Sequence, residues 1–228
     1  YIENMKDALP DPARVKAIKK DLESKGVKYI YSHWIDFLGS PKTKPMPISD
    51  FEDLCAGKGP QFAVHSVSFV PELTAADNDQ IPVPDLDSLL ICPWDKTCAW
   101  VFSDLWWNGK PYDVCPRQTL KKQIKKNADA DLKFYVGMEP EFFVMKWEDG
   151  KPVKAIDRDP ISLRRQAFGY DSEYSIDGMN FLKEIIDILN EDLKWELHDV
   201  VAEGAYGQYE LDFGYTDMLG MADRFIFL

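Results

Sequence analysis

The sequence has few of the residues that build zinc sites or disulfide frameworks. It holds three histidines and four cysteines in 228 residues, and the cysteines, Cys55, Cys92, Cys98 and Cys115, never occur in a Cys-x-x-Cys spacing. This scarcity argues against a zinc site and against a disulfide-stapled secreted domain. We therefore expect free thiols in a reducing cytoplasm.

Long apolar runs and an excess of positive charge are also absent. No apolar stretch reaches the roughly 18 residues that a transmembrane helix requires. The formal net charge is −12 and the pI is near 4.7, which argues against nucleic acid or an anionic membrane as a partner, because phosphate groups are bound by clustered Lys and Arg. With 45% hydrophobic residues, the chain can bury a sizeable core, so we expect an acidic globular protein.

Two glutamates stand out because they alternate with apolar residues. Between Phe134 and Val144 every even position is apolar, whereas Glu139 and Glu141 occupy odd positions, which is the period of a β-strand. Such residues lie about 6.5 to 7 Å apart on one face, so the two carboxylates favour a shared cation. Pro140 lies between them and predicts a bulge or an edge position. A solvent-facing strand edge that carries two acids is the alternative.

A second acidic segment runs from Glu203 to Asp212. Gln208, Glu210 and Asp212 alternate with apolar residues, as in a strand with one polar face. Glycines between Glu203 and Glu210 predict a bend that folds the two glutamates onto a common face. Four glutamates from two strands form an all-oxygen ligand set that suits Mg²⁺ or Mn²⁺ rather than zinc. The predicted metal ligands are Glu139, Glu141, Glu203 and Glu210.

Taken together, these segments resemble glutamine synthetase. The resemblance rests on Gly-Met-Glu-Pro-Glu-Phe-Phe at 137–143, on the Glu-x₄-Gln-x-Glu spacing at 203–210, and on Pro-Tyr and Cys-Pro-Arg at 111–117. The segments also follow one another in the family's order. The resemblance implies an α+β fold, with a small N-terminal β-grasp domain at 1–110. The first half of a catalytic domain, with a mainly antiparallel sheet and flanking helices, would follow at 111–228.

The family's reaction is then the expected function. The resemblance implies ATP-dependent ligation of ammonia to the γ-carboxylate of L-glutamate through a γ-glutamyl phosphate, with two or more Mg²⁺ or Mn²⁺ ions at each site. Glu141, Glu203 and Glu210 would hold the metal nearest glutamate and ammonia. Glu139 would contribute to the metal beneath the ATP phosphates.

Further site residues follow from the same resemblance. Asp36 lies in a strand-turn that the family presents to a neighbouring subunit, where it and Glu203 would bind ammonium and remove its proton. The implied assembly is a homo-oligomeric ring, a dodecamer by resemblance. Asp79 would lie near the ammonium site, and His198 and Tyr215 near the nucleotide. The alternatives are a turn-forming role for Asp36 and a solvated acidic turn for Asp79.

Other functions stay open. A γ-glutamylalkylamide synthetase, using methylamine for example, is the nearest alternative, and a member that kept the fold but lost catalysis is another. Family members continue for roughly as many residues again, so we expect no ligase activity from these 228 residues alone.

Local patterns predict the remaining elements. They are helices at 11–26, from 116, at 177–189 and at 218–228, a hairpin at 27–48, strands at 89–94 and 98–104, a solvent-exposed basic helix face formed by Lys121, Lys122, Lys125 and Lys126, and a long loop at 157–175.

Overall fold

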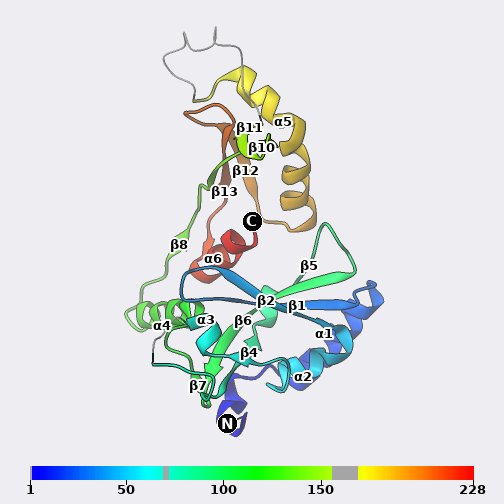
Figure 1. The fold of residues 1–228 in the computed structure, drawn as a ribbon, viewed down its shortest axis with the longest axis vertical. Helices are drawn as coiled ribbons and strands as arrows, with labels where there is room; N and C mark the ends of the chain where they lie inside the picture. Colours follow the sequence, from blue (N-terminus) through cyan, green and yellow to red (C-terminus); the bar gives the residue numbers. More distant parts are fainter. Residues whose placement is uncertain (1, 69–71, 156–168) are drawn as a thin grey trace. The chain divides into compact units, whose positions relative to one another are not determined.

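The computed structural model describes residues 2–68, 72–155 and 169–228. The fold is α+β, as predicted, and the chain divides into two compact units, residues up to 133 and residues 134–226. Each unit has its own β-sheet structure (Figure 1). Within the described ranges, no helix combines the length and apolar character needed to cross a membrane.

The first unit is built on a seven-stranded sheet. The main path is β2–β1–β6–β4–β3, and the short strands β5 and β7 pair with β6. β1 and β6 run parallel, and the other neighbours run antiparallel. The strands are β1 (Tyr29–Ile35), β2 (Pro41–Pro47), β3 (Phe62–Ala63), β4 (Asp79–Pro84), β5 (Leu90–Ile91), β6 (Cys98–Trp107) and β7 (Lys110–Pro111).

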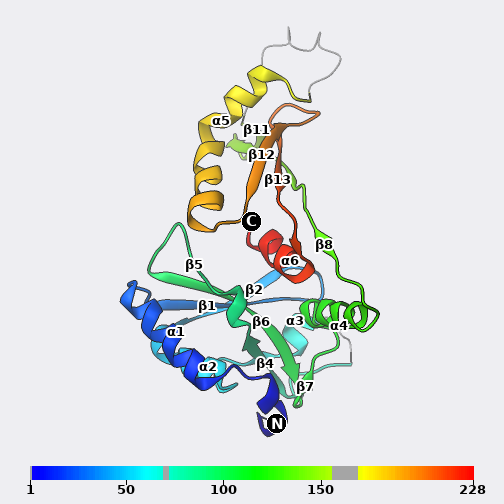
Figure 2. The same cartoon turned by 180° about the vertical axis from the view of Figure 1, so that it is seen from behind.

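Helices pack on this sheet through a shared apolar core. Leu22 from α1, Ile30 from β1, and Phe51 and Leu54 from α2 belong to one buried cluster, and α1 and α2 lie beside the sheet in both views (Figure 2). α1 starts where predicted because the Asp11 carboxylate accepts a hydrogen bond from the Arg14 N–H at 2.9 Å. The helical segments are η1 (Ile2–Ala8), α1 (Pro12–Ser24), η2 (Ile48–Asp50), α2 (Phe51–Cys55), α3 (His65–Ser68), η3 (Leu86–Ser88) and α4 (Pro116–Ala128).

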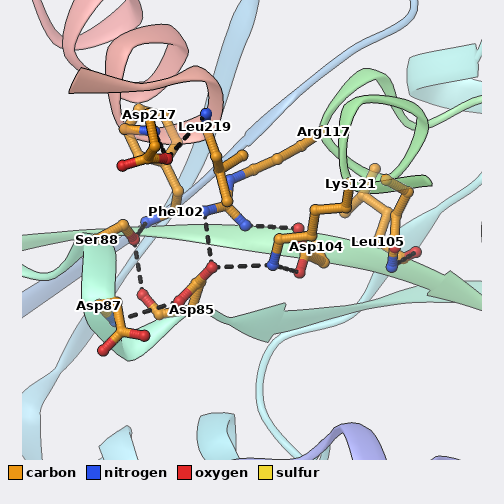
Figure 3. A network of polar contacts seen from close by, with 12 residues as sticks. Asp85, Asp87, Ser88, Phe102, Asp104, Leu105, Arg117, Lys121, Asp217 and Leu219 are labelled. Carbon is orange, nitrogen blue, oxygen red and sulfur yellow. Dashed lines mark hydrogen bonds and ion pairs between the residues drawn. The ribbon is translucent and has the colours of Figure 1, made fainter. Parts of the chain in front are cut away.

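A buried ion network ties α4 to the first unit (Figure 3). The Arg117 guanidinium donates to Asp104 at 2.6 Å and to Asp85 at 2.8 Å. The Lys121 ammonium contacts the same two carboxylates, at 2.5 Å and 2.9 Å respectively. The predicted solvent-exposed face is confirmed for Lys122, Lys125 and Lys126. It is wrong for Lys121, whose side chain is 33% exposed and contacts two aspartates.

The domain boundary near residue 110 stays a prediction. α4 follows that boundary in sequence, yet its residues belong to the first compact unit. The physical reason is the network of Arg117 and Lys121 with the two aspartates, which fastens the helix to the sheet.

The second unit contains a three-stranded antiparallel sheet in the order β12–β13–β9. α5 lies beside β12 and β13 in both views (Figures 1 and 2). The Tyr209 hydroxyl on β13 donates to the Tyr174 carbonyl of α5 at 3.0 Å, and a Cβ at Gly178 would overlap the Tyr209 ring, so this close approach requires glycine. The elements are β8 (Tyr135–Val136), β9 (Glu141–Phe143), β10 (Met145–Glu148), β11 (Lys151–Lys154), α5 (Ser172–Asp187), the π-helical segment η5 (Ile188–Asp192), β12 (Leu197–Ala202), β13 (Gln208–Phe213), β14 (Thr216–Asp217) and α6 (Met218–Phe227).

The single strand predicted from Phe134 to Val144 is broken in the structure. β8 pairs with β14, whereas β9 pairs with β13 at the edge of the three-stranded sheet. Pro140 lies in the connection, where its carbonyl accepts from the Leu211 N–H at 3.2 Å. Proline has no N–H to give to a ladder, so the break falls at this edge.

The predicted long loop at 157–175 is largely outside the described residues, which leave out 156–168. Its last part is helical, because α5 begins at Ser172 rather than at Asp177. The cause is a cap that the sequence pattern did not reveal: the Asp171 carboxylate accepts from the N–H groups of Glu173 and Tyr174.

Candidate metal centre

The candidate metal centre contains two neighbouring strands that place two glutamates opposite each other. In the ladder between β13 and β9, Glu210 is the direct partner of Glu141. Directly opposed like charges destabilise an antiparallel pair. One of the two carboxylates is fixed by an amide, because Gln208 Nε2 donates to Glu141 Oε2 at 2.6 Å.

A tight turn brings in a third glutamate. β12 and β13 form a hairpin in which the Glu203 N–H donates to the Gln208 carbonyl at 3.0 Å and the Gln208 N–H donates to the Ala205 carbonyl at 3.1 Å. Gly207 adopts a φ of +72° there, which glycine tolerates at no steric cost. The turn carries Glu203 back to Glu210, as the sequence predicted, and their carboxyl groups share a hydrogen bond.

The carboxylates form two adjacent groups that share Glu210. One group is Glu141, Glu203 and Glu210, and the other is Glu139, Glu210 and Asp212. Within each group, one oxygen from every residue lies within 4.8 Å of the others. All four glutamates predicted as metal ligands are thus brought together, and metal binding itself stays a prediction.

Two carboxyl groups of the cluster, where negative charges are crowded, have raised pKa values. The hydrogen bond with Glu203, followed by burial and the neighbouring charges, raises the pKa of Glu210 to about 7. Burial, followed by the hydrogen bond and charge of Asp199, raises the pKa of Asp212 to about 6. A divalent cation would neutralise these crowded carboxylates and take the place of the protons that they bind. A ligand set made only of oxygen atoms fits Mg²⁺ or Mn²⁺.

Sequence reasoning missed Asp212 as a member of the cluster. The residue lies on β13 two positions after Glu210, on the same partly buried face of the strand. The alternation of Gln208, Glu210 and Asp212 contained this signal, because residues two apart on a strand share a face. A family motif that ends at Glu210 does not reveal it.

The two residues predicted near the nucleotide lie in the second unit. His198 is an exposed residue of β12. Tyr215 is 79% exposed, and its ring would lie 3.0 Å from a Cβ at Gly137, just before the Glu139 segment. Their predicted role in nucleotide binding is not tested by this geometry.

Two of the three residues predicted near ammonium, Asp36 and Asp79, lie in the first unit. Asp36 is buried between β1 and β2, where one carboxylate oxygen accepts from the N–H groups of Leu38 at 2.9 Å and Ser40 at 2.8 Å. The other oxygen lies 3.4 Å from the Lys42 ammonium. Asp36 therefore builds the turn, which was the alternative interpretation, and its role toward ammonium stays a prediction. Asp79 is exposed at the start of β4.

Comparison with known proteins places these elements in a family. The family model described as "Glutamine synthetase, catalytic domain" matches residues 113–228, just over half of the chain. A glutamine synthetase of Rhizobium meliloti is 32% identical over 203 residues, covering 89% of this chain and 44% of that protein. A glutamate–methylamine ligase of Methyloversatilis universalis is 29% identical over 211 residues, covering 90% of this chain and 45% of that protein.

Solved structures agree with these matches. The structure titled "GmaS/ADP complex-Conformation 1" superimposes with a TM-score of 0.79 at 28% identity, covering 92% of this chain and 46% of that one. The chain thus spans about half the length of the relatives that it matches. The chain belongs to the glutamine synthetase family.

Proposed function

We propose that the protein ligates ammonia to the γ-carboxylate of L-glutamate at the expense of ATP, through a γ-glutamyl phosphate. The observation that carries this proposal is the pair of three-residue carboxylate clusters that share Glu210. Family membership supports the reaction class, because relatives named glutamine synthetase and glutamate–methylamine ligase both match the chain.

The cluster's chemistry fits an ATP-dependent ligation. Divalent cations bound there would neutralise phosphate oxygens and align donor with acceptor. The chain's own contribution is the positioning of the ligands: the β9–β13 ladder fixes Glu141 and Glu210, and the turn fixes Glu203. Two adjacent carboxylate groups support two cation positions, with Glu210 between them.

Proton removal from ammonium is assigned to Glu203 and Asp36. Ammonium has no lone pair until it loses a proton, so a carboxylate near the attacking nitrogen is required. We place Glu203 in this role, with Asp36 reaching the site from a neighbouring subunit of a closed ring. Asp79 would assist in ammonium binding, and His198 and Tyr215 would contact the nucleotide.

A second candidate differs only in the amine. The glutamate–methylamine ligase and the GmaS structure match as much of the chain as the glutamine synthetases do. Steady-state release of ADP by the full-length protein, measured with glutamate and either ammonia or methylamine, separates the two. A kcat/KM at least tenfold higher with methylamine would replace the first candidate by the second.

Metal binding is tested directly by a matched pair of variants. We expect isothermal titration of the full-length protein with Mn²⁺ to show binding that Glu210→Gln weakens by more than tenfold, because this carboxylate belongs to both groups. Glu191→Gln is the control, since Glu191 is an exposed residue of the same unit whose carboxylate is 3.7 Å from Lys194. Unchanged Mn²⁺ affinity in Glu210→Gln would overturn the assignment of the cluster as the metal centre.

A further inference from the structure

Two cysteines face each other at the end of a hairpin in the first unit. β5 and β6 pair antiparallel, with Leu90 opposite Trp100 and Ile91 opposite Ala99. The ladder continues one step further, because the Cys92 N–H donates to the Cys98 carbonyl at 2.9 Å. Cys92 and Cys98 therefore lie opposite each other where the ladder ends, since the Cys98 N–H donates to the Asp95 carbonyl at 3.0 Å. Residues opposite each other in an antiparallel pair project to the same face of the sheet.

This placement meets the backbone requirement for a disulfide. Directly opposed residues of an antiparallel pair have Cα atoms about 4.5 to 5.5 Å apart. Disulfide-bonded cysteines have Cα atoms about 4.4 to 6.8 Å apart. The two cysteines carry free thiols in the structure, so oxidation requires little backbone movement.

The thiols lie directly beneath an exposed turn. Cys92 and Cys98 are buried, whereas Trp94, Asp95 and Lys96 between them are exposed. The Cys98 sulfur is 3.3 Å from Asp95 Oδ2 in that turn. Hairpin ends open locally at a lower free energy than the centre of a sheet, so opening of this turn gives a small reagent access to the sulfurs.

We propose that Cys92 and Cys98 form a reversible intramolecular disulfide and that this turn is a redox modification site for low-molecular-weight disulfides. Cys98 loses its proton and attacks one sulfur of the oxidant, which releases one thiolate and leaves a mixed disulfide on Cys98. Cys92 then loses its proton and attacks the Cys98 sulfur, which releases the second thiolate. Two protein thiols are oxidised by two electrons, and the oxidant is reduced to two thiols.

The order of attack follows from the surroundings of the two sulfurs. Burial, followed by the charge of Cys98, raises the pKa of the Cys92 thiol to about 11, which disfavours Cys92 as the first nucleophile. The Cys98 sulfur contacts the turn that opens. Transient disulfides of this kind are the form expected in a reducing compartment.

The other two cysteines provide matched controls. Cys55 and Cys115 are as buried as the pair, but each lies in a separate apolar cluster, Cys55 with α2 and Cys115 next to α4. Burial raises the pKa of the Cys55 thiol to about 12 and also raises that of Cys115. We expect both to stay reduced in the folded protein.

Peptide mapping after oxidation tests the proposal. The full-length native protein is incubated with oxidised glutathione, quenched with an alkylating reagent and digested with trypsin, which cuts after Lys96 between the two cysteines. We expect two peptides joined through Cys92 and Cys98, a bond that dithiothreitol reverses. Cys92→Ser should leave glutathione on Cys98, whereas Cys55→Ser and Cys115→Ser should form the bond normally.

The result that would overturn the proposal is equally specific. It would be glutathione adducts alone on the native wild-type protein, unreacted thiols at both positions, or a 92–98 bond that forms only in urea. The wild-type digest decides this without any variant, so a folding defect in Cys92→Ser does not affect the outcome. The test is also independent of ligase activity.

Discussion

Replacing Arg117 by methionine is expected to loosen α4 from the first unit. The Arg117 side chain is only 4% exposed and bonds Asp85 and Asp104, whose side chains are 17% and 13% exposed. Removing one partner from a buried ion pair leaves charges that have lost their solvation, and this typically costs about 3–5 kcal/mol. Lys121 still contacts both carboxylates, so we expect the lower end, about 3 kcal/mol.

The pH dependence gives a second measure of the same network. Burial alone would raise the pKa of Asp85, but the hydrogen bond from Lys121 and the charge of Arg117 outweigh it and lower the pKa from 3.8 to about 2. The folded pKa is depressed, so this carboxylate stabilises the fold fully above pH 3.8 and loses that contribution as the pH falls through 2. The contribution is about 2 kcal/mol, allowing for the part of Asp85 that faces solvent.

Hydrogen exchange of the α4 amides measures the effect where it arises. A loss of about 3 kcal/mol corresponds to exchange faster by on the order of a hundredfold. Urea unfolding between pH 2 and pH 6 should show a smaller acid-induced loss of stability in Arg117→Met than in the wild type, because without the guanidinium the folded pKa of Asp85 rises toward its unfolded value.

Lys122→Met is the matched control for this experiment. Lys122 is on the same helix and pairs with Asp113, but both side chains are more than half exposed, and exposed pairs contribute about 0–1 kcal/mol. Equal protection of the α4 amides in Arg117→Met and Lys122→Met would refute the reasoning that burial makes the first network different.

Three further predictions concern packing, capping and pH. Gly178→Ala should destabilise the second unit by about 1–3 kcal/mol in urea unfolding, because the new methyl group overlaps the Tyr209 ring; a variant as stable as wild type would contradict that contact. Asp217→Ala should lower stability by about 1 kcal/mol through loss of the α6 cap, and Asp217→Asn should restore most of it; equal melting temperatures for all three would count against the cap. Burial lowers the pKa of His33 from 6.5 to about 4, so between these pH values the unfolded chain binds a proton that the folded chain does not. The free energy of unfolding should therefore fall by up to about 3 kcal/mol as the pH is lowered from 6.5 to 4, and a His33→Phe variant with the same pH slope would reject this assignment.

Local sequence patterns predict where several helices begin and where one strand lies. Asp11 and Pro12 predict the start of α1, Pro116 predicts α4, and Asp217 predicts α6, because capping and proline preferences act within a few residues. The alternation from Gln208 to Asp212 predicts β13 for the same local reason. The glycines before it predict the turn that returns Glu203 to Glu210.

Tertiary structure decided which strands and side chains meet. The sequence could not show that Glu141 pairs directly with Glu210, because register is set by contacts across many residues. It also could not show that Lys121 leaves the solvated face of α4 to join two aspartates, since periodicity describes a helix face and not what packs against it. Asp212 entered the cluster through the same long-range pairing.

The sequence by itself therefore determined the family resemblance, which implied the α+β class, and the strand that carries Glu210, because motifs and alternation depend on residue types at short spacings. Only the three-dimensional fold decided the shared role of Glu210, the break at Pro140 and the pairing of Cys92 with Cys98. These features depend on which distant segments lie side by side, and that is fixed by packing and hydrogen bonding of the whole unit.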